Sequence, residues 1–423
     1  AAVSILTVIL VMGKLTRKKV NIDNSVIITQ KDTPTDMTEI KDTHEGMVRS
    51  LLSGQWVSKE DYQNVPYAVM YSNIYDAMPQ SDIGQADVVF ESPVEGGITR
   101  MCCLFENKTD LEKIGPVRSC RTYFLLFAKE FEAVYVHFGY SEYAAGYLQR
   151  ASFHSLDGMN YCNFYRSSDR VAPHNAYTSW DGITESAEYK GYKLTYPDGF
   201  VPPFTFNTDD DKKIVPENGA SCKKLDMNYP YNDPWFEYDE KTGKYLRYQF
   251  GAAQIDRESG EQLSFDNILI KYVTPAYYEN GTPNYKIYGS GKGLFVSNGY
   301  ASEVTWIKES ESEGATKYYY GDGTEIVIDL SKSHDKGRIN LSINSKSPYM
   351  PPETIKGLFS RYVTCSEKMD KVGSGVLLYL AKRIINLHRG DIHINSFKDN
   401  YNFYSIVFPC INECKFCACA QKV

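Results

Sequence analysis

The sequence predicts an α+β protein with three folded parts: an α/β N-terminal domain, an antiparallel β-meander domain and a small α/β C-terminal fragment. Residues 94–138 show an apolar run, a loop, a helical pattern and a second apolar run, which is typical of a βαβ-like unit. Between 245 and 330, short apolar runs alternate with turn dipeptides, as in an antiparallel meander. An amphipathic pattern at 374–388 and strand patterns at 391–397 and 402–408 predict the third part.

Composition limits the functional classes. The chain has 423 residues, enough for two or three domains, and its 53 acidic residues outnumber its 46 lysines and arginines. This balance gives no indication of a nucleic-acid partner. The 34 tyrosines are unusual in number. Tyrosine suits both half-buried strands and wet binding surfaces, and the exposed faces of sheets are the simpler explanation.

The order of segments predicts five regions. An apolar run at 1–13 precedes a basic cluster, so we expect residues 1–19 to be a membrane anchor or the remnant of a signal. The remaining regions are a polar stalk at 20–61, an α/β domain at 62–238, a β-rich domain at 239–332 and a C-terminal unit with a cysteine-rich tail at 333–423. The last part of the α/β domain, 201–238, is rich in Pro, Asp and Asn and predicts little regular structure.

Local signals predict individual elements. In the α/β domain we expect strands at 67–73 and 86–91 and helices at 122–132, 141–150 and 179–190. Ser179 is the expected N-cap of the last helix, and Gly191 its stop. In the β-rich domain we expect strands at 245–250, 263–272, 285–288, 294–297, 301–307, 317–320 and 324–330, with hairpin signals at Asn280-Gly281, Asn298-Gly299 and Asp322-Gly323.

A set of cationic and amide side chains in the α/β domain is the candidate ligand-binding site. Its members are Arg100, Arg118, Arg121, His137, Arg170, His174 and Asn175. Two of the arginines come at the start of a predicted helix, where unpaired N–H groups already favour an anion. Either Glu91, Glu95 and Asp87 neutralise the arginines, or a bound anion does, because guanidinium groups bind carboxylates and phosphates with two hydrogen bonds. No Ser-His-Asp or Cys-His arrangement has local support, so we expect binding rather than catalysis.

Two further patterns predict no cofactor. Residues 289–293 read GSGKG, but the spacing of a phosphate-binding loop is absent and a strand pattern follows. Ten cysteines are present; the first six are expected to be reduced and buried, with Cys102 and Cys103 on opposite faces of a strand. The last four, from Cys410 onward, have irregular spacing for zinc, so we expect no metal site.

From Pro66 to about Leu330 the chain resembles the YerB-like family of bacterial envelope lipoproteins, whose molecular activity is unassigned. The segments that carry the resemblance are PYAVMYSN, MPQSDIGQADVVFE, EGGITR, EKIGPVRSCR, VYVHFG, RVAPHNAYT, FGAAQIDRESGEQLSF, YGSGKG, SNGYASEVTW and YYYGDGTEI. This resemblance implies a two-domain protein at the extracytoplasmic face of the cell membrane. The family supplies no catalytic residues to transfer.

From about Lys336 to Pro409 the chain resembles the second half of a histidine-kinase ATP-binding domain. The resembling segments are PPE and LFSRY at 351–362, GSGVLLYLAKRI at 373–384, and the Gly390-Asp391-Ile392 turn. Asn344, Gly373 and Gly375 are the nucleotide-binding positions that this resemblance implies. However, the helix with the magnesium-binding asparagine is missing, and the D-x-G-x-G motif reads NSKSP at 344–348.

Together these observations predict a membrane-anchored envelope protein whose partners are the bacterial membrane and an anionic or polar envelope ligand. The alternative is a sensor-kinase-like protein, an enzyme that would require ATP and Mg²⁺, with a degenerate nucleotide-binding domain.

Overall fold

A computed structural model describes residues 5–11, 47–160, 163–207, 213–329, 338–346, 381–385, 391–397 and 401–409. The chain divides into two compact units, residues 1–331 and 332–423. Helices and mostly antiparallel sheets are mixed within the chain, which confirms the predicted α+β class. The predicted α/β and β-rich domains lie within the first unit and share its large sheet.

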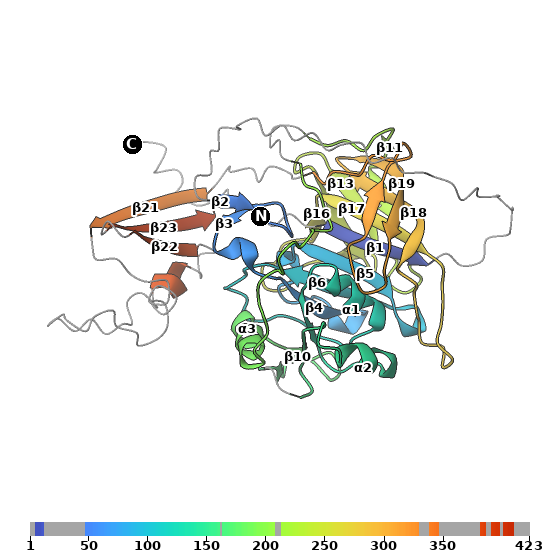
Figure 1. Cartoon of the computed structure of the whole chain (residues 1–423), viewed down its shortest axis with the longest axis horizontal. Coiled ribbons are helices and arrows are strands. Elements are labelled where there is room, and N and C mark those ends of the chain that lie inside the picture. The colour runs from blue at the N-terminus through green and yellow to red at the C-terminus, as the bar shows by residue number, and fades with distance from the viewer. Residues whose placement is uncertain are drawn as a thin grey trace. The chain divides into compact units, whose positions relative to one another are not determined.

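The large sheet of the first unit has eleven strands (Figure 1). In spatial order they are β11 (Ala220–Ser221), β19 (Tyr300–Lys308), β18 (Gly289–Ser297), β17 (Asn267–Val273), β1 (Ile5–Val11), β5 (Val88–Pro93), β6 (Thr99–Phe105), β4 (Tyr67–Asn73), β7 (Val134–His137) and β8 (Ser155–Asp157), and β20 (Lys317–Tyr319) pairs with β19.

Strand β1 corrects part of the predicted membrane anchor. Ile5–Val11 pairs in parallel with β17 on one side and with β5 on the other. Its sequence, ILTVILV, is rich in β-branched and apolar residues, which suits a central strand of a sheet as well as it suits a membrane. Within the described residues no helix has the length and apolarity needed to span a membrane.

The two faces of the large sheet carry different layers. On one face, α1 (Thr122–Lys129) buries Phe124 and Phe127 against strand residues such as Phe90, with the Phe90 and Phe127 rings stacked 4.8 Å apart. On the other face lie α3 (Trp180–Tyr189) and residues of a five-stranded sheet, including Phe236. That sheet consists of β12 (Lys224–Asp226), β13 (Trp235–Asp239), β14 (Lys244–Gln249), β15 (Ala252–Ala253) and β16 (Ser264–Phe265).

The remaining elements of the first unit are short. They are α2 (Glu142–Leu148), the hairpins β2–β3 (Met47–Arg49, Trp56–Ser58) and β9–β10 (Tyr165–Arg166, Ala176–Tyr177), and the 3₁₀ turns η1 (Asp61–Gln63), η2 (Tyr75–Ala77), η3 (Ile83–Gln85) and η4 (Glu95–Gly97).

Several local predictions are confirmed. Ser179 caps α3 by accepting a hydrogen bond from the Gly182 N–H at 3.1 Å. Cys102 and Cys103 are buried on opposite faces of β6, one in each hydrophobic core. Cys120 is also a buried free thiol, and Cys222 is a half-buried one.

Other local predictions are wrong. Residues 201–238 have little regular structure, as predicted, but the short strands β11, β12 and the start of β13 within them were missed, because they form by pairing with other strands. Residues 285–288 form no strand, and of 324–329 only two residues, Glu325 and Ile328, make isolated bridges. The predicted meander is also divided between two sheets, because β14 belongs to the five-stranded sheet and β17, β18 and β19 belong to the large one.

The second unit contains a three-stranded sheet in the order β21 (Arg338–Lys346), β23 (Tyr401–Pro409), β22 (Asp391–Phe397). Both pairings are antiparallel, and β22 and β23 agree with the two strands predicted for this part of the chain. Residues 381–385 are helical, as the amphipathic pattern predicts. The resembling segments at 351–362 and the cysteine-rich tail lie outside the described residues.

Candidate anion-binding site

The candidate site lies at one edge of the large sheet. Strands β4, β5 and β7 run in the same direction, because β6 is antiparallel to β4 and β5, and β7 is parallel to β4. They end at Asn73, Pro93 and His137, and β6 begins beside the first two at Thr99. Ligands of α/β sheets commonly bind outside the carboxyl ends of parallel strands.

Arg118 and Arg121 lie in one segment, which crosses this edge just before α1. The Arg118 N–H donates to the Met70 carbonyl at 2.8 Å, and the Phe138 N–H donates to the Arg118 carbonyl at 3.0 Å. The segment is therefore held between the middle of β4 and the residue that follows β7. Helix α1 begins directly after Arg121, which occupies its N-cap position. The side chains of this segment thus lie beside the positive end of the helix.

One of the three arginines at this edge has a carboxylate partner. Arg121 makes a bidentate pair with Glu95, with nitrogen–oxygen distances of 2.7 and 2.8 Å. The other two candidate carboxylates pair with different cations: Glu91 with Arg247 at 2.9 Å and Asp87 with Lys108 at 3.1 Å.

Arg100 and Arg118 have only carbonyl partners among the described residues. Arg100 is 5% exposed and donates to the Ser119 carbonyl. Its burial, together with the neighbouring Arg121 and Arg118, lowers its pKa to about 10. Arg118 donates to the Pro173 carbonyl at 3.2 Å, and burial and nearby arginines lower its pKa as well. Neighbouring guanidinium groups therefore repel one another at a partly buried edge, which a bound anion would relieve.

The loop 166–175 adds the other predicted residues to this edge. Arg170 donates to the Asp76 and Pro79 carbonyls at 2.9 and 2.5 Å. His174 Nδ1 lies 3.3 Å from Ser72 Oγ, and burial and the charge of Arg118 lower its pKa.

Asn175 is oriented by an arginine that the sequence reasoning missed. Its Oδ1 accepts a hydrogen bond from Arg166 at 2.6 Å, and its Nδ2 donates to the Ser167 carbonyl at 3.4 Å. Arg166 is exposed and also lies over the Phe138 ring. Its position at the end of β9, four residues before Arg170 in the same hairpin, could have identified Arg166 as a member of this site. The structure thus places Arg100, Arg118, Arg121, Arg170, His174 and Asn175 around one edge and adds Arg166.

His137 has a different role. Its ring is 1% exposed, its Nδ1 donates to the Gly139 carbonyl at 2.8 Å, and Asp157 lies 3.9 Å away. Burial lowers its pKa, so the neutral form with a proton on Nδ1 is favoured. His137 therefore supports the loop after β7 from inside the protein.

A buried polar network lies beneath this edge and joins the two predicted domains. Arg247 and Glu91 are both fully buried and form the ion pair noted above. Asn73 and Thr99 donate to the same Glu91 Oε1 at 3.0 and 2.7 Å. Gln254 accepts from Arg247 Nε at 2.6 Å. The two charges thus match each other, and Glu91 Oε1 and Arg247 Nε are also hydrogen-bonded, although Arg247 Nη1 has no hydrogen-bond partner among the described residues.

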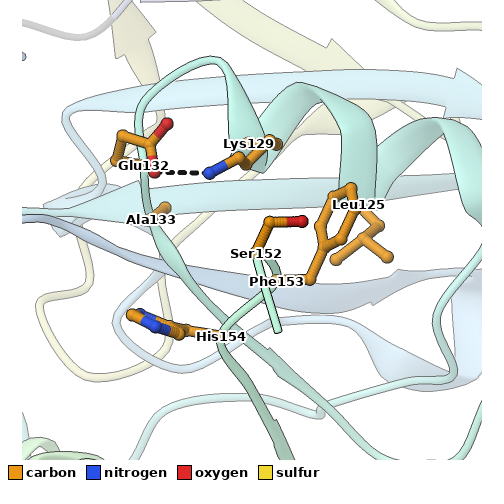
Figure 2. A pocket seen from close by; sticks show the side chains of 7 residues that line it. All are labelled: Leu125, Lys129, Glu132, Ala133, Ser152, Phe153 and His154. Carbon is orange, nitrogen blue, oxygen red and sulfur yellow. Dashed lines mark hydrogen bonds and ion pairs between the residues drawn. The ribbon is translucent and has the colours of Figure 1, made fainter. Parts of the chain in front are cut away.

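A hollow at the C-terminal end of α1 is too small to bind a ligand such as sulfate. Figure 2 shows Lys129 paired with Glu132 there, beside Ser152 and His154. The pair spans 2.5 Å, and the hollow has a volume of about 10 Å³. That volume is enough for a single water molecule.

The structure describes only one of the three predicted nucleotide-binding positions. Gly373 and Gly375 lie outside the described residues. Asn344 lies in β21 opposite Phe403. Within the described residues, no group of three or more His, Cys, Asp or Glu side chains could hold a metal ion.

Comparisons with known proteins match three parts of the chain to protein families. Residues 52–193 match the "Protein of unknown function (DUF3048) N-terminal domain", and residues 225–331 match the corresponding C-terminal domain. Residues 306–410 match the family described as "Histidine kinase-, DNA gyrase B-, and HSP90-like ATPase".

Similar proteins come from Bacillus subtilis (strain 168). The chain is 32% identical over 266 residues to "Putative lipoprotein YerB", an alignment that covers 61% of this chain and 78% of that protein. A crystal structure of the YerB protein from Bacillus subtilis superposes with a TM-score of 0.58 at 29% identity and covers 67% of this chain and 93% of the other. The sensor histidine kinase YvrG is 36% identical over 101 residues, which are 23% of this chain and 17% of that protein.

Proposed function

This chain belongs to the family of YerB-like proteins built from the two DUF3048 domains, and from that premise we propose that it is a cell-envelope protein that binds an anionic ligand. The ligand occupies the edge formed by Arg100, Arg118, Arg121, Arg170, His174 and Asn175. The observation that carries the proposal is the lack of a carboxylate partner for Arg100 and Arg118 among the described residues, although both are partly or fully buried.

The chemistry suits binding. Guanidinium groups provide planar forks of donors that match the oxygens of phosphate, sulfate or carboxylate. Arg118 and Arg170 project from two different segments, so an anion between them would be held from two sides. The N-terminus of α1 adds its dipole to the same edge.

The test is calorimetric titration of the full chain with sulfate at low ionic strength. We expect Arg118→Ala to weaken sulfate binding about tenfold or more, because it removes a charge-assisted donor from the site. Arg150→Ala, which removes an exposed arginine beyond α2, is the matched control and should leave binding unchanged. Unchanged binding in Arg118→Ala would contradict the proposed site.

The envelope location is part of the same proposal. It rests on the name of the B. subtilis relative, and we place the protein at the extracytoplasmic face of the cell membrane. Because Ile5–Val11 pairs within the sheet, the proposal does not depend on that segment as the anchor. Protease treatment of intact cells should cleave the exposed loops of the first unit; protection until lysis would contradict this location.

A second candidate function concerns the second unit and rests on its match to an ATPase family. The motif departures at 344–348 argue against tight nucleotide binding. We expect Mg-ATP to bind the full chain weakly or not at all. Micromolar binding that is lost in Asn344→Ala would instead favour a sensor-kinase-like function.

A further inference from the structure

An aromatic surface lies beside the proposed anion site. The Tyr75 and Tyr231 rings each contact the Phe250 ring edge-on, with centroids 5.5 Å apart in both cases. Tyr75 is 66% exposed and Tyr231 42% exposed, whereas Phe250 is half-buried between them. We call these three residues the aromatic platform. Large exposed aromatic groups gathered from three separate segments mark a contact surface.

The platform is built on the buried network. Asn73, Asn232 and Gln249 stand next to, or two residues from, Tyr75, Tyr231 and Phe250 in the sequence. Gln249 donates to Asn73 Oδ1 at 2.9 Å, and Asn232 donates to Gln249 Oε1 at 3.0 Å. All three amides are buried. Hydrogen bonds between the three segments therefore fix the relative positions of the rings above them.

The turn that presents Phe250 is also unusual. Phe250 and Gly251 connect β14 and β15, and both have positive φ, 53° and 76°. Asparagine or glycine is favoured at the first position of such a turn, because a left-handed backbone disfavours a bulky side chain. The backbone at Phe250 is therefore locally strained, and backbone strain of this kind is concentrated at functional positions.

The aromatic platform approaches the anion site at two points. On one side, Arg170 donates to the carbonyl of Asp76, the residue that follows Tyr75. On the other side, a Cβ added to Gly97 of η4 would lie 3.6 Å from Pro230 Cγ, so η4, which also carries Glu95, the partner of Arg121, runs close to the residue before Tyr231. The cationic edge and the aromatic platform thus form neighbouring parts of one surface.

We propose that the ligand of this surface is an anionic sugar, whose phosphate or carboxylate group binds Arg118, Arg170 and His174 while its ring lies on the aromatic platform. This rests on the proposed anion site and names the class of its ligand. The C–H groups of a sugar ring carry partial positive charge and pack on the negative face of an aromatic ring. The tyrosine hydroxyl groups remain able to hydrogen-bond the sugar hydroxyls.

The test compares glucose 1-phosphate with inorganic phosphate by calorimetric titration of the full chain. We expect glucose 1-phosphate to bind more tightly than phosphate. Tyr75→Ala should weaken glucose 1-phosphate binding about fivefold or more and leave phosphate binding unchanged, because the variant removes ring contact without changing charge. Arg118→Ala should weaken the binding of both. Glucuronate replaces glucose 1-phosphate in a second series, which separates phosphate-bearing from carboxylate-bearing sugars.

Matched controls keep the outcomes distinct. Tyr189→Ala removes a tyrosine that is 85% exposed on α3 and should change neither affinity. Tyr231→Ala repeats the test from a different segment. Phosphoserine carries a phosphate without a sugar ring; if it binds as tightly as glucose 1-phosphate and Tyr75→Ala affects neither, the sugar inference is overturned while the anion site stands. If Arg118→Ala changes no affinity, the proposed function itself fails.

Discussion

Arg247 and Arg118 show two different uses of an arginine at the same edge of the sheet. Arg247 is fully buried, and its charge is matched by Glu91 and by two glutamine oxygens. Arg118 is half-buried, lies near three other arginines and donates to a carbonyl. The first arrangement matches the buried charge with an opposite one, whereas the second leaves positive charge in excess. The comparison teaches that the matched pair fixes the structure and the unmatched group is available for a ligand.

The largest expected effect comes from breaking the matched pair. Arg247→Met should lower the free energy of unfolding by about 3–5 kcal/mol, because Glu91 is left buried without its partner. Arg118→Met, the control of equal size, should change it by less than about 1 kcal/mol. Urea unfolding of the full chain measures both. Equal losses in the two variants would remove the distinction between the two arginines.

Increasing the unmatched charge should produce an intermediate effect. Glu95→Gln removes the carboxylate that pairs with Arg121, so sulfate affinity should rise about two- to fivefold at low salt, and the gain should shrink as salt is added. Glu240→Gln, which breaks the exposed pair with Lys223, is the control and should leave affinity unchanged. Weaker binding in Glu95→Gln would show that Glu95 orients Arg121 for the ligand.

The smallest expected effect is a pH dependence through His174. Burial, Arg118 and Arg170 lower the pKa of His174 and Asp76 opposes them, so its ring is neutral at pH 7. Acidification through that lowered pKa adds a positive charge to the site. Sulfate keeps its charge in this range, so its affinity should rise about threefold between pH 7.5 and pH 5. His174→Gln should flatten the profile; an unchanged slope would exclude His174 from the site.

Local chemistry made much of the fold predictable. Strand β4 has the predicted bounds, Tyr67–Asn73. The Asn298-Gly299 signal forms the turn between β18 and β19, with φ of 50° and 83°. In both cases the information lies in a few adjacent residues. The short strands within 201–238 were missed because strands such as β11 form through pairing with residues far away in the sequence, for example Ser221 with Tyr300.

The proximity of most candidate residues to one another was predictable from the sequence, but their charge balance was not. The sequence gathers Arg118, Arg121, Arg170 and His174 into two segments, and the structure brings these segments together. Glu91 pairs with Arg247 instead of with these arginines, and Arg247 lies in the other predicted domain. The same long-range packing brings Phe250 into contact with both Tyr231 and Tyr75, and no local pattern contains that information.

The buried thiols of the first unit have a consequence for oxidation. Burial raises the pKa of Cys102, Cys103 and Cys120, so almost none of each is thiolate, the form that reacts with oxidants and alkylating agents. In the folded protein these three cysteines are therefore inert, even in an oxidising compartment. Unfolding would expose them, so the rate at which they become alkylated records how often the large sheet opens.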